Sequence, residues 1–525
     1  MNKFPSIFND VIGPVMTGPS SSHTAGPARI GRLAGQFAVN KIIKADIYFE
    51  TNGSFANTYK GQRSDKGLSG GLLGWEPEDI RMVNSLTEAA ESGLDISFSI
   101  ADFEANHPNT VKLLLTDDKA VQYLVTGISV GGGMVEIIGF NGFEVSIEGD
   151  LFELIILCKT IDITELVVEQ LKKSNYEPYA VKTASNESGF MINIKLSKEL
   201  PLNLIKEIGS LYPIDYIKLI KPVLPILSGK ECTMPFKSCE DIIKYSEANN
   251  MDLFEAALHY ECSRGAVSEG EALEKMRHIL EIMKASIEKG IVGREKMPYM
   301  LQHQAYKVKK AAEERRLLDL GVLNKIIYSA MAGMETSSSM GVIAAAPTAG
   351  SCGIIPGTLI PVCESLGLHD EDCIKALFCA GLIGVLIAYN ATFSAETCGC
   401  QAECGSAASM AAAGIVYLAG GTVKQSLAAA SLSLQNVLGL ICDPVGGLAE
   451  IPCMSRNIMA SANAVSCANM ALSGVDEVIP LDEVITAMNN VGAMLPPELR
   501  CTCKGGLAVT KTAEMLNSDL KQIKY

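Results

Sequence analysis

The sequence has little positive charge, no leader-like N-terminus and no apolar run long enough to cross a bilayer. Its 44 Lys and Arg residues are outnumbered by 59 Asp and Glu residues, which gives a net charge of −15. Because phosphate binding needs a basic surface, we expect no nucleic-acid partner. Residues 1–17 lack the unbroken apolar stretch of a signal peptide, and the run from Ala376 to Tyr389 is shorter than a membrane span. We therefore expect a cytoplasmic protein without membrane contacts, in which 376–389 forms a buried helix.

We also expect no disulfide bonds, although the sequence has 16 cysteines. Without an export signal, cysteines normally stay reduced. Their distribution is uneven, because Cys158 is the only one before residue 230 and fifteen follow it. We expect most of the fifteen to be small buried hydrophobic residues. Four in apolar or helical stretches are predicted to be of this kind: Cys363, Cys373, Cys379 and Cys467.

Three other cysteines occur in segments that are unusual for a core. Cys400 lies in CGCQAE, and Cys442 and Cys453 close the segment CDPVGGLAEIPC. Three thiolates can bind three irons of a cubane 4Fe–4S cluster and leave the fourth iron without a protein ligand. A catalytic zinc likewise keeps one position open for substrate, so the pattern suggests Lewis-acid chemistry on a small carboxylate.

The chain length of 525 residues predicts roughly two to four domains. We expect an α+β multidomain protein. Residues 1–143 alternate helical and extended patterns and form a predicted α/β domain. Residues 144–222 are predicted to form a compact βαββαβ unit whose first strand covers Val145–Leu157. Residues 231–525 are predicted to be mainly helical, after a linker with Pro222 and Pro225.

A serine-rich loop, GPSSSHTAGP, precedes a predicted helix near the N-terminus. Free backbone N–H groups at a helix start, together with the hydroxyls of Ser20, Ser21 and Ser22, suit a carboxylate or a phosphate. His23 can exchange a proton near neutral pH. The alternative is an ordinary serine cap followed by a surface histidine, and an isolated motif would favour that alternative.

Together these segments resemble the iron–sulfur-dependent L-serine dehydratases. Residues 1–222 resemble the β subunit of the two-subunit bacterial form through IGPVMTGPSSSHTAGPARIGR, HPNT and GISVGGG. Residues 231–525 resemble the α subunit through APTAG, GIIPGTL, CQAE, GSAASMAAAG, CDPVGGLAEIPC and GGLAVT. The middle unit resembles the ACT regulatory domain of some members. The chain is thus identified as a fusion of both parts.

The resemblance implies an activity, a cofactor and a set of site residues. The activity is the β-elimination of water from L-serine, a small amino-acid substrate, to give pyruvate and ammonia. The cofactor is a 4Fe–4S cluster with an oxygen-sensitive open iron. The implied cluster ligands are Cys400, Cys442 and Cys453. The candidate substrate contacts are Ser20, Ser21, Ser22, Thr348 and Asn390, with His23 for proton transfer. Asp443 lies beside a cluster segment, where a supporting and a structural role are both open.

The sequence also departs from the family pattern. The family usually has Gly-His-Gly-Thr-Asp where this chain has GQRSD at 61–65. Gln62 cannot exchange a proton near pH 7, and Arg63 could pair with an extra substrate carboxylate or sulfonate. Before Gly505, the family's Glu-Thr is replaced by Cys501-Thr502-Cys503. Three further thiols, Cys352, Cys398 and Cys404, lie in the motifs near the predicted cluster. Three interpretations are open: core substitutions without effect on function, alternative cluster ligands, or adaptation to another substrate.

Two other functions remain open. One is a divergent 4Fe–4S lyase for another β-substituted small amino or hydroxy acid, which Gln62 and Arg63 would suit. The other is a non-catalytic iron or redox sensor. We expect the protein to be a homodimer whichever of the three functions it has.

Overall fold

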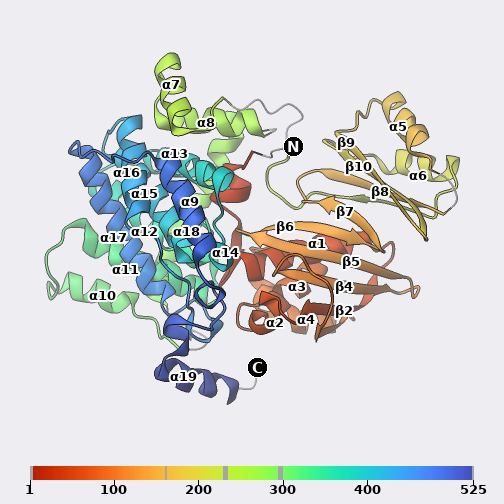
Figure 1. The fold of residues 1–525 in the computed structure, drawn as a ribbon, viewed down its shortest axis with the longest axis horizontal. Helices are drawn as coiled ribbons and strands as arrows, with labels where there is room; N and C mark the ends of the chain where they lie inside the picture. Colours follow the sequence, from red (N-terminus) through yellow and green to blue (C-terminus); the bar gives the residue numbers. More distant parts are fainter. Residues whose placement is uncertain (1–3, 160–161, 229–234, 266, 294–299, 523–525) are drawn as a thin grey trace.

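The computed structural model describes residues 4–159, 162–228, 235–265, 267–293 and 300–522. Two sheet-containing units lie on the right in Figure 1, and a helical part lies on the left. The predicted α+β multidomain fold is confirmed. Residues 229–234, which follow the predicted linker prolines Pro222 and Pro225, lie outside the described residues.

The first unit is a six-stranded sheet covered by helices. Its strand order is β3-β2-β4-β5-β6-β7, and only β2 and β3 run parallel. The strands are β2 (Ile42–Glu50), β3 (Asp95–Ala101), β4 (Thr110–Asp117), β5 (Gln122–Gly131), β6 (Met134–Phe140) and β7 (Phe143–Ile147). The helices are α1 (Gly26–Phe37), α2 (Ser54–Thr58), α3 (Ser64–Leu72) and α4 (Ser85–Glu91). Alternate residues of β4, such as Leu113 and Leu115, are buried, as expected of a sheet with one covered face.

The second unit has the predicted βαββαβ order. It consists of β8 (Phe152–Cys158), α5 (Thr164–Lys173), β9 (Ala180–Asn186), β10 (Gly189–Leu196), α6 (Leu202–Leu211) and β11 (Tyr216–Ile220). The sheet order is β11-β8-β10-β9, the arrangement of a ferredoxin-like split βαβ unit. The predicted single strand Val145–Leu157 is wrong. Gly149, whose φ is +77°, breaks it into β7 of the first sheet and β8 of the second.

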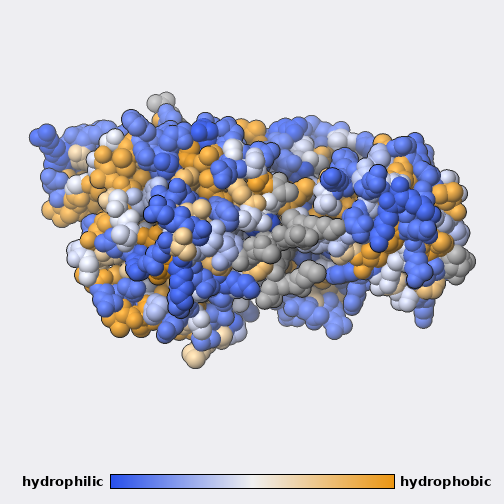
Figure 2. All heavy atoms as spheres, turned by 90° about the horizontal axis from the view of Figure 1, so that it is seen from above, coloured by the Kyte–Doolittle hydropathy of each residue, from blue (hydrophilic) through white to orange (hydrophobic). Residues whose placement is uncertain are grey.

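The remaining chain is mainly helical, as predicted. Its helices are α7 (Cys239–Asn249), α8 (Leu253–Arg264), α9 (Glu269–Val292), α10 (Ala305–Glu313), α11 (Val322–Ser338), α12 (Ile354–Ser365), α13 (Asp370–Asn390), α14 (Ala395–Cys398), α15 (Ser406–Leu418), α16 (Val423–Gln435), α17 (Cys453–Leu472), α18 (Leu481–Met494) and α19 (Lys511–Gln522). The small-residue helix α15 packs against α12, α13, α16 and α17, because alanine and glycine let helix backbones approach closely. Viewed from above, hydrophobic residues appear at the surface mainly over this part (Figure 2).

Helix α13 contains the long apolar run. It extends over 21 residues, beyond the predicted 376–389, and is the one helix among the described residues that is long and apolar enough to cross a membrane. However, 78% of its most apolar stretch is buried inside the protein. The prediction of a buried helix is therefore confirmed, although the helix is longer than the run suggested.

A two-stranded antiparallel sheet joins the N-terminal unit to the helical part. Strand β1 (Val15–Thr17) pairs with β12 (Val342–Ala344), with Met16 opposite Ile343. At Gly18 the chain lies so close to α11 that an added Cβ would be 2.0 Å from the carbonyl oxygen of Ser337. The serine loop follows β1 directly, and Thr348 follows β12. This pairing brings the two predicted substrate-binding segments to one place.

Candidate active site and metal centre

The serine loop forms the predicted helix start. After Gly18-Pro19, a π-helical turn at Ser21–Ala25 leads into α1, and the Ser20 hydroxyl accepts a hydrogen bond from the His23 N–H at 3.1 Å. Ser20 begins the turn with extended backbone, as a serine N-cap usually does. The loop also contacts the segment after β12, because the Ala349 N–H donates to Ser21 Oγ at 3.4 Å.

A small cavity of about 50 Å³ lies where the serine loop meets the cysteine segments. Six of the predicted site residues line it: Ser20, Ser21, Ser22, Thr348, Cys442 and Cys453. It is also lined by Gln62, Glu396, Glu403 and Cys501. The structure thus brings hydroxyl groups, carboxyl groups and thiols from distant parts of the chain around one small cavity.

His23 lies directly behind Ser22. Its side chain is fully buried, so the alternative of a surface histidine is wrong. Ser22 Oγ lies 2.8 Å from His23 Nδ1 and 2.9 Å from a carboxylate oxygen of Glu396, so its hydroxyl can donate to either. His23 Nε2 lies 3.0 Å from Ser54 Oγ. Burial lowers the pKa of His23, and the negative charge of Glu396 partly offsets this effect.

A second, half-buried carboxyl group, that of Glu403, faces the cavity from the cysteine segment. The Thr348 hydroxyl donates a hydrogen bond to Glu403 and lies 3.1 Å from Ser351 Oγ. Burial raises the pKa of Glu403 to about 7, although the Thr348 hydrogen bond acts in the opposite direction. A carboxyl group with this pKa can release or accept a proton near neutral pH.

Glu396 and Glu403 were not among the site residues predicted from the sequence. A signal was present, because they are the only two charged residues between positions 391 and 414. In a stretch of alanine, glycine, serine and cysteine, a buried carboxyl group needs a polar partner. The partners, Ser22 and Thr348, come from elsewhere in the chain and could not be identified from the local sequence.

The three predicted ligand cysteines are buried. Cys400 precedes a π-helical turn at Gln401–Gly405, and its Sγ lies 3.3 Å from Cys404 Sγ. Cys442 forms an isolated bridge with Arg500, and Cys453 begins α17. Burial, with the charges of Glu403 and Cys400, raises the pKa of Cys453 well above its ordinary value.

This donor set fits an iron–sulfur group. Cys400, Glu403 and Cys404 present ligand atoms that all lie within 4.8 Å of one another. Cys442 and Cys453 line the adjoining cavity with Glu403. Soft thiolates are typical iron–sulfur ligands. Cys400, Cys442 and Cys453 remain the predicted ligands, and the ligand atoms that the structure places closest together are those of Cys400, Glu403 and Cys404.

Asn390, one of the predicted substrate contacts, lies outside the cavity. It is the exposed last residue of α13, and its side-chain amide donates to the Leu386 carbonyl at 3.0 Å. The prediction for Asn390 therefore receives no support from the fold. Asn390 is the last residue of α13, and its side chain faces away from the cavity. The sequence did not show where this helix ends.

Several other singled-out residues have structural contacts. Cys352 Sγ lies 3.8 Å from the Gly333 carbonyl, and Cys398 Sγ lies 3.7 Å from Asn489 Oδ1. Asp443 forms a buried ion pair with Arg456 at 2.7 Å and accepts a hydrogen bond from the Leu507 N–H. Asp443 therefore fixes the segment that carries Cys442.

Gln62 lines the small cavity, whereas Arg63 does not. Gln62 is buried, lines the cavity and donates from its side-chain amide to the Gly447 carbonyl at 3.2 Å. Arg63 donates to the Lys60 carbonyl at 3.4 Å and is not among the residues that line the cavity. The proposed pairing of Arg63 with a substrate anion therefore has no support in this structure.

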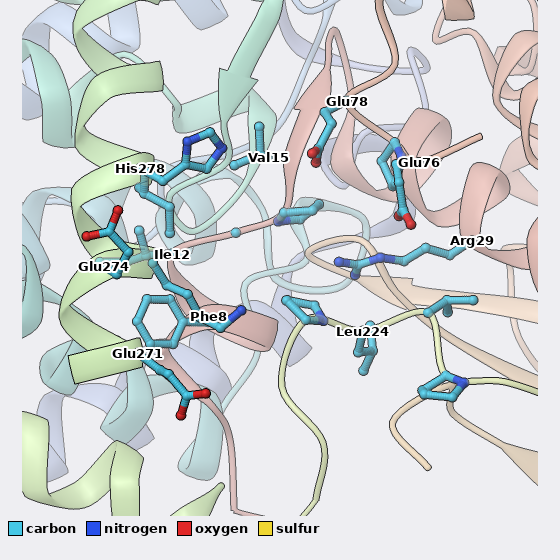
Figure 3. A pocket seen from close by; sticks show the side chains of 18 of the residues that line it. Phe8, Ile12, Val15, Arg29, Glu76, Glu78, Leu224, Glu271, Glu274 and His278 are labelled. Atoms are coloured by element: carbon cyan, nitrogen blue, oxygen red, sulfur yellow. The ribbon is translucent and has the colours of Figure 1, made fainter. Parts of the chain in front are cut away.

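A larger cavity of about 710 Å³ lies between the N-terminal unit and α9 (Figure 3). Its labelled side chains include Arg29, Glu76 and Glu78 on one side and Glu274 and His278 on the other. None of the predicted site residues lines it. Although this cavity is larger than the one at the serine loop, we do not assign the reaction to it, because the predicted site residues lie elsewhere.

Comparison with known proteins assigns both parts of the chain. Residues 242–508 match the model of the serine dehydratase alpha chain, and residues 10–93 match the beta chain. A probable L-serine dehydratase alpha chain from Bacillus subtilis (strain 168) is 39% identical over 285 residues, which cover 54% of this chain and 95% of that protein. An L-serine dehydratase from Streptomyces coelicolor is 29% identical over 505 residues, or 94% of this chain and 96% of that protein.

L-serine dehydratase 1 of Escherichia coli (strain K12) is 27% identical over 512 residues, which again cover 94% of this chain and 96% of the relative. The expected fusion of the two parts is therefore confirmed. The chain belongs to the serine dehydratase family, with the alpha-chain and beta-chain regions in one polypeptide.

Proposed function

We propose that this protein is an L-serine ammonia-lyase that converts L-serine to pyruvate and ammonia. The observation that carries the proposal is the small cavity, where hydroxyl groups of the beta-type region face thiols of the alpha-type region. The names of relatives that match 94% of the chain support the same activity. The small cavity also suits a small amino acid.

The cofactor in this proposal is a 4Fe–4S cluster held by Cys400, Cys442 and Cys453. When bound, the cluster supplies a Lewis acid that polarises the bond between the β-carbon and its hydroxyl oxygen. Ser20 and Ser21, with the N–H groups at the start of the turn, bind the substrate carboxylate.

The proton from the α-carbon is taken up on the serine-loop side. Ser22 faces the cavity and lies within hydrogen-bond distance of both His23 and Glu396. Ser22 Oγ takes up this proton as it passes its own hydroxyl proton to His23 Nδ1, so that the serine stays neutral and His23 becomes protonated. The released aminoacrylate becomes an imine and hydrolyses to pyruvate and ammonia.

Substrate can approach through a neighbouring cavity of about 600 Å³. This cavity is lined by Ser54 and Cys503 and shares Glu396 and Cys501 with the small one. Glu396 and Cys501 therefore lie between the two cavities.

The test is turnover of a panel of β-substituted small acids by protein reconstituted with iron and sulfide without oxygen. We expect pyruvate and ammonia from L-serine in equal amounts. Turnover of another panel member with none of serine would favour the divergent lyase. Full iron content without any turnover would favour the sensor. The expected homodimer stays a prediction, and sedimentation of the same sample measures it.

The divergent lyase is kept as a second candidate because of Gln62. This residue lines the cavity, and a neutral amide cannot exchange a proton near pH 7. We expect Gln62→His to change serine turnover little, because Ser22, His23 and Glu396 already supply a path for the proton. The kcat for serine, measured beside the unmodified protein, checks this expectation.

Arg63→Ala is the matched control, since Arg63 lies next in sequence but does not line the cavity. It should leave kcat and KM for serine unchanged. A gain in serine turnover toward roughly 10²–10⁴-fold for Gln62→His would mean instead that this chain has lost a catalytic proton carrier. A loss of activity on a different substrate would favour the divergent lyase.

A further inference from the structure

Ser54 contacts the second ring nitrogen of His23. Its Oγ is 3.0 Å from His23 Nε2, whereas Ser22 Oγ is 2.8 Å from the other ring nitrogen, Nδ1. Ser22 lines the small cavity, but Ser54 does not, and instead lines the neighbouring cavity of about 600 Å³. Any effect of Ser54 on a reaction in the small cavity therefore passes through His23.

The backbone around Ser54 is fixed on both sides. Ser54 is the first residue of α2, and its N–H donates to the Pro108 carbonyl at 2.8 Å. The preceding Gly53 lies so close to this segment that an added Cβ would be 2.7 Å from the same carbonyl oxygen. At the other end of α2, the Thr58 hydroxyl donates to the Ser54 carbonyl at 2.6 Å. These contacts hold Ser54 in place beside His23.

The ring of His23 has few neighbours that can bind its hydrogens. It is fully buried, and Phe55 packs edge-on against it with the ring centroids 5.0 Å apart. Among the residues that the structure describes, Ser54 is the hydrogen-bond partner of Nε2. Ser22 and Glu396 lie at Nδ1, where a carboxylate oxygen of Glu396 is 3.6 Å away. A hydrogen on Nε2 therefore depends on Ser54 for an acceptor.

The proposed proton path requires one particular tautomer of His23. A neutral imidazole carries its hydrogen on one nitrogen only, and Nδ1 needs a free lone pair to receive the proton from Ser22. The hydrogen must then be on Nε2. The negative charge of Glu396 works against this arrangement, because it attracts the hydrogen to Nδ1. A hydrogen-bond acceptor at Nε2 opposes that attraction.

We propose that Ser54 is a positioning residue that accepts the hydrogen of His23 Nε2 and so leaves Nδ1 free for the proton from Ser22. The inference rests on the lyase activity proposed above and adds a residue to its proton path. The same hydrogen bond persists when His23 is protonated, and it becomes stronger because the donor is then charged. The Nε2–H bond stays intact throughout, and no electrons are transferred. Ser54 therefore stabilises the protonated ring more than the neutral one.

The charged groups around His23 set the direction of the expected pH effect. Burial lowers the pKa of His23, and the negative charge of Glu396 partly offsets this effect. The nearby His107 has a pKa that is lowered by burial and raised by the same carboxylate. The serine and phenylalanine side chains at the ring are uncharged. Loss of the Ser54 hydroxyl should therefore lower the pKa of His23 further, because the protonated ring loses an acceptor.

The test compares Ser54→Thr with Ser54→Val in the full-length protein reconstituted with iron and sulfide without oxygen. The two variants have the same shape, and only threonine keeps the hydroxyl. The added methyl group has room, because Ser54 borders the larger cavity. Ser54→Val should lower kcat for serine by roughly 10–100-fold, the effect of losing a hydrogen bond to a charged group, and should move the acid fall in activity to lower pH. Ser54→Thr should keep the kcat and the pH profile of the unmodified protein.

The KM for serine and the iron content should be the same in both variants, since Ser54 does not line the small cavity. Asn57→Ala is the matched control, because Asn57 is an exposed residue of the same helix and lines the same larger cavity. It should leave kcat and the pH profile unchanged. Equal kcat values and equal pH profiles for Ser54→Thr and Ser54→Val would overturn the proposal.

The pKa of His23 can also be measured without turnover, from the ring resonances of protein labelled with isotope-enriched histidine. The resonance of His23 is the one that is missing from His23→Ala. We expect its pKa to be lower in Ser54→Val than in Ser54→Thr. This result in a protein that does not turn over serine would contradict the lyase activity and leave the hydrogen bond standing. Equal pKa values in a protein that does turn over serine would contradict the role of Ser54 alone.

Discussion

Replacing Cys400, Cys442 or Cys453 singly by alanine is expected to abolish serine turnover and to remove most of the bound iron. Each thiol would hold one iron, and a cubane cluster that loses a fixed ligand is exposed and unstable. The unmodified protein should be brown and contain about four irons per chain when purified without oxygen. Iron and acid-labile sulfide, measured chemically on the same samples, check this expectation.

Cys467→Ala is the matched control. Cys467 is fully buried in α17, the helix that Cys453 begins, and its Sγ accepts a hydrogen bond from the Asn436 amide at 3.3 Å. It does not line the small cavity, so its loss should leave the iron content unchanged. Full iron and sulfide in all three ligand variants would show that the ligand assignment is wrong.

Replacing His23 by alanine is expected to lower kcat for serine by roughly 10²–10⁴-fold, the range for losing a general acid or base. The cluster spectrum should not change, because His23 contacts Ser22 and Ser54 and no cysteine of the centre. Steady-state kinetics and the visible spectrum test the two statements separately. Normal turnover would make His23 a structural residue.

The pH dependence gives His23 a second readout. Burial lowers the pKa of His23 below its ordinary 6.5, so the ring is neutral at pH 7 and can accept a proton. Activity should hold above about pH 6.5 and fall only as the pH drops through the lowered pKa. Glu396→Gln removes a charge that raises this pKa, so the fall should move to lower pH. His278→Ala, in the larger cavity of Figure 3, should change neither rate nor pH profile.

Local signals were sufficient for several elements. The sequence Gly18-Pro19 followed by serines predicted a helix start, and the structure has a serine-capped turn there. The order of helices and strands from 152 to 220 was also predicted, because the spacing of apolar residues differs between helices and strands. The break at Gly149 was missed, because the positive φ of a single glycine does not change the spacing of the apolar residues around it.

The composition and the motifs by themselves determined the family and the fold class, because these depend on residue types and spacing along the chain. Only the tertiary structure decided which residues of the motifs meet. The Ala349 N–H and Ser21 Oγ are 328 positions apart and are joined by the pairing of β1 with β12. Glu396, Gln62 and Cys501 reach the cavity and Asn390 does not, because packing between distant segments fixes the direction of each side chain. No local pattern contains that information.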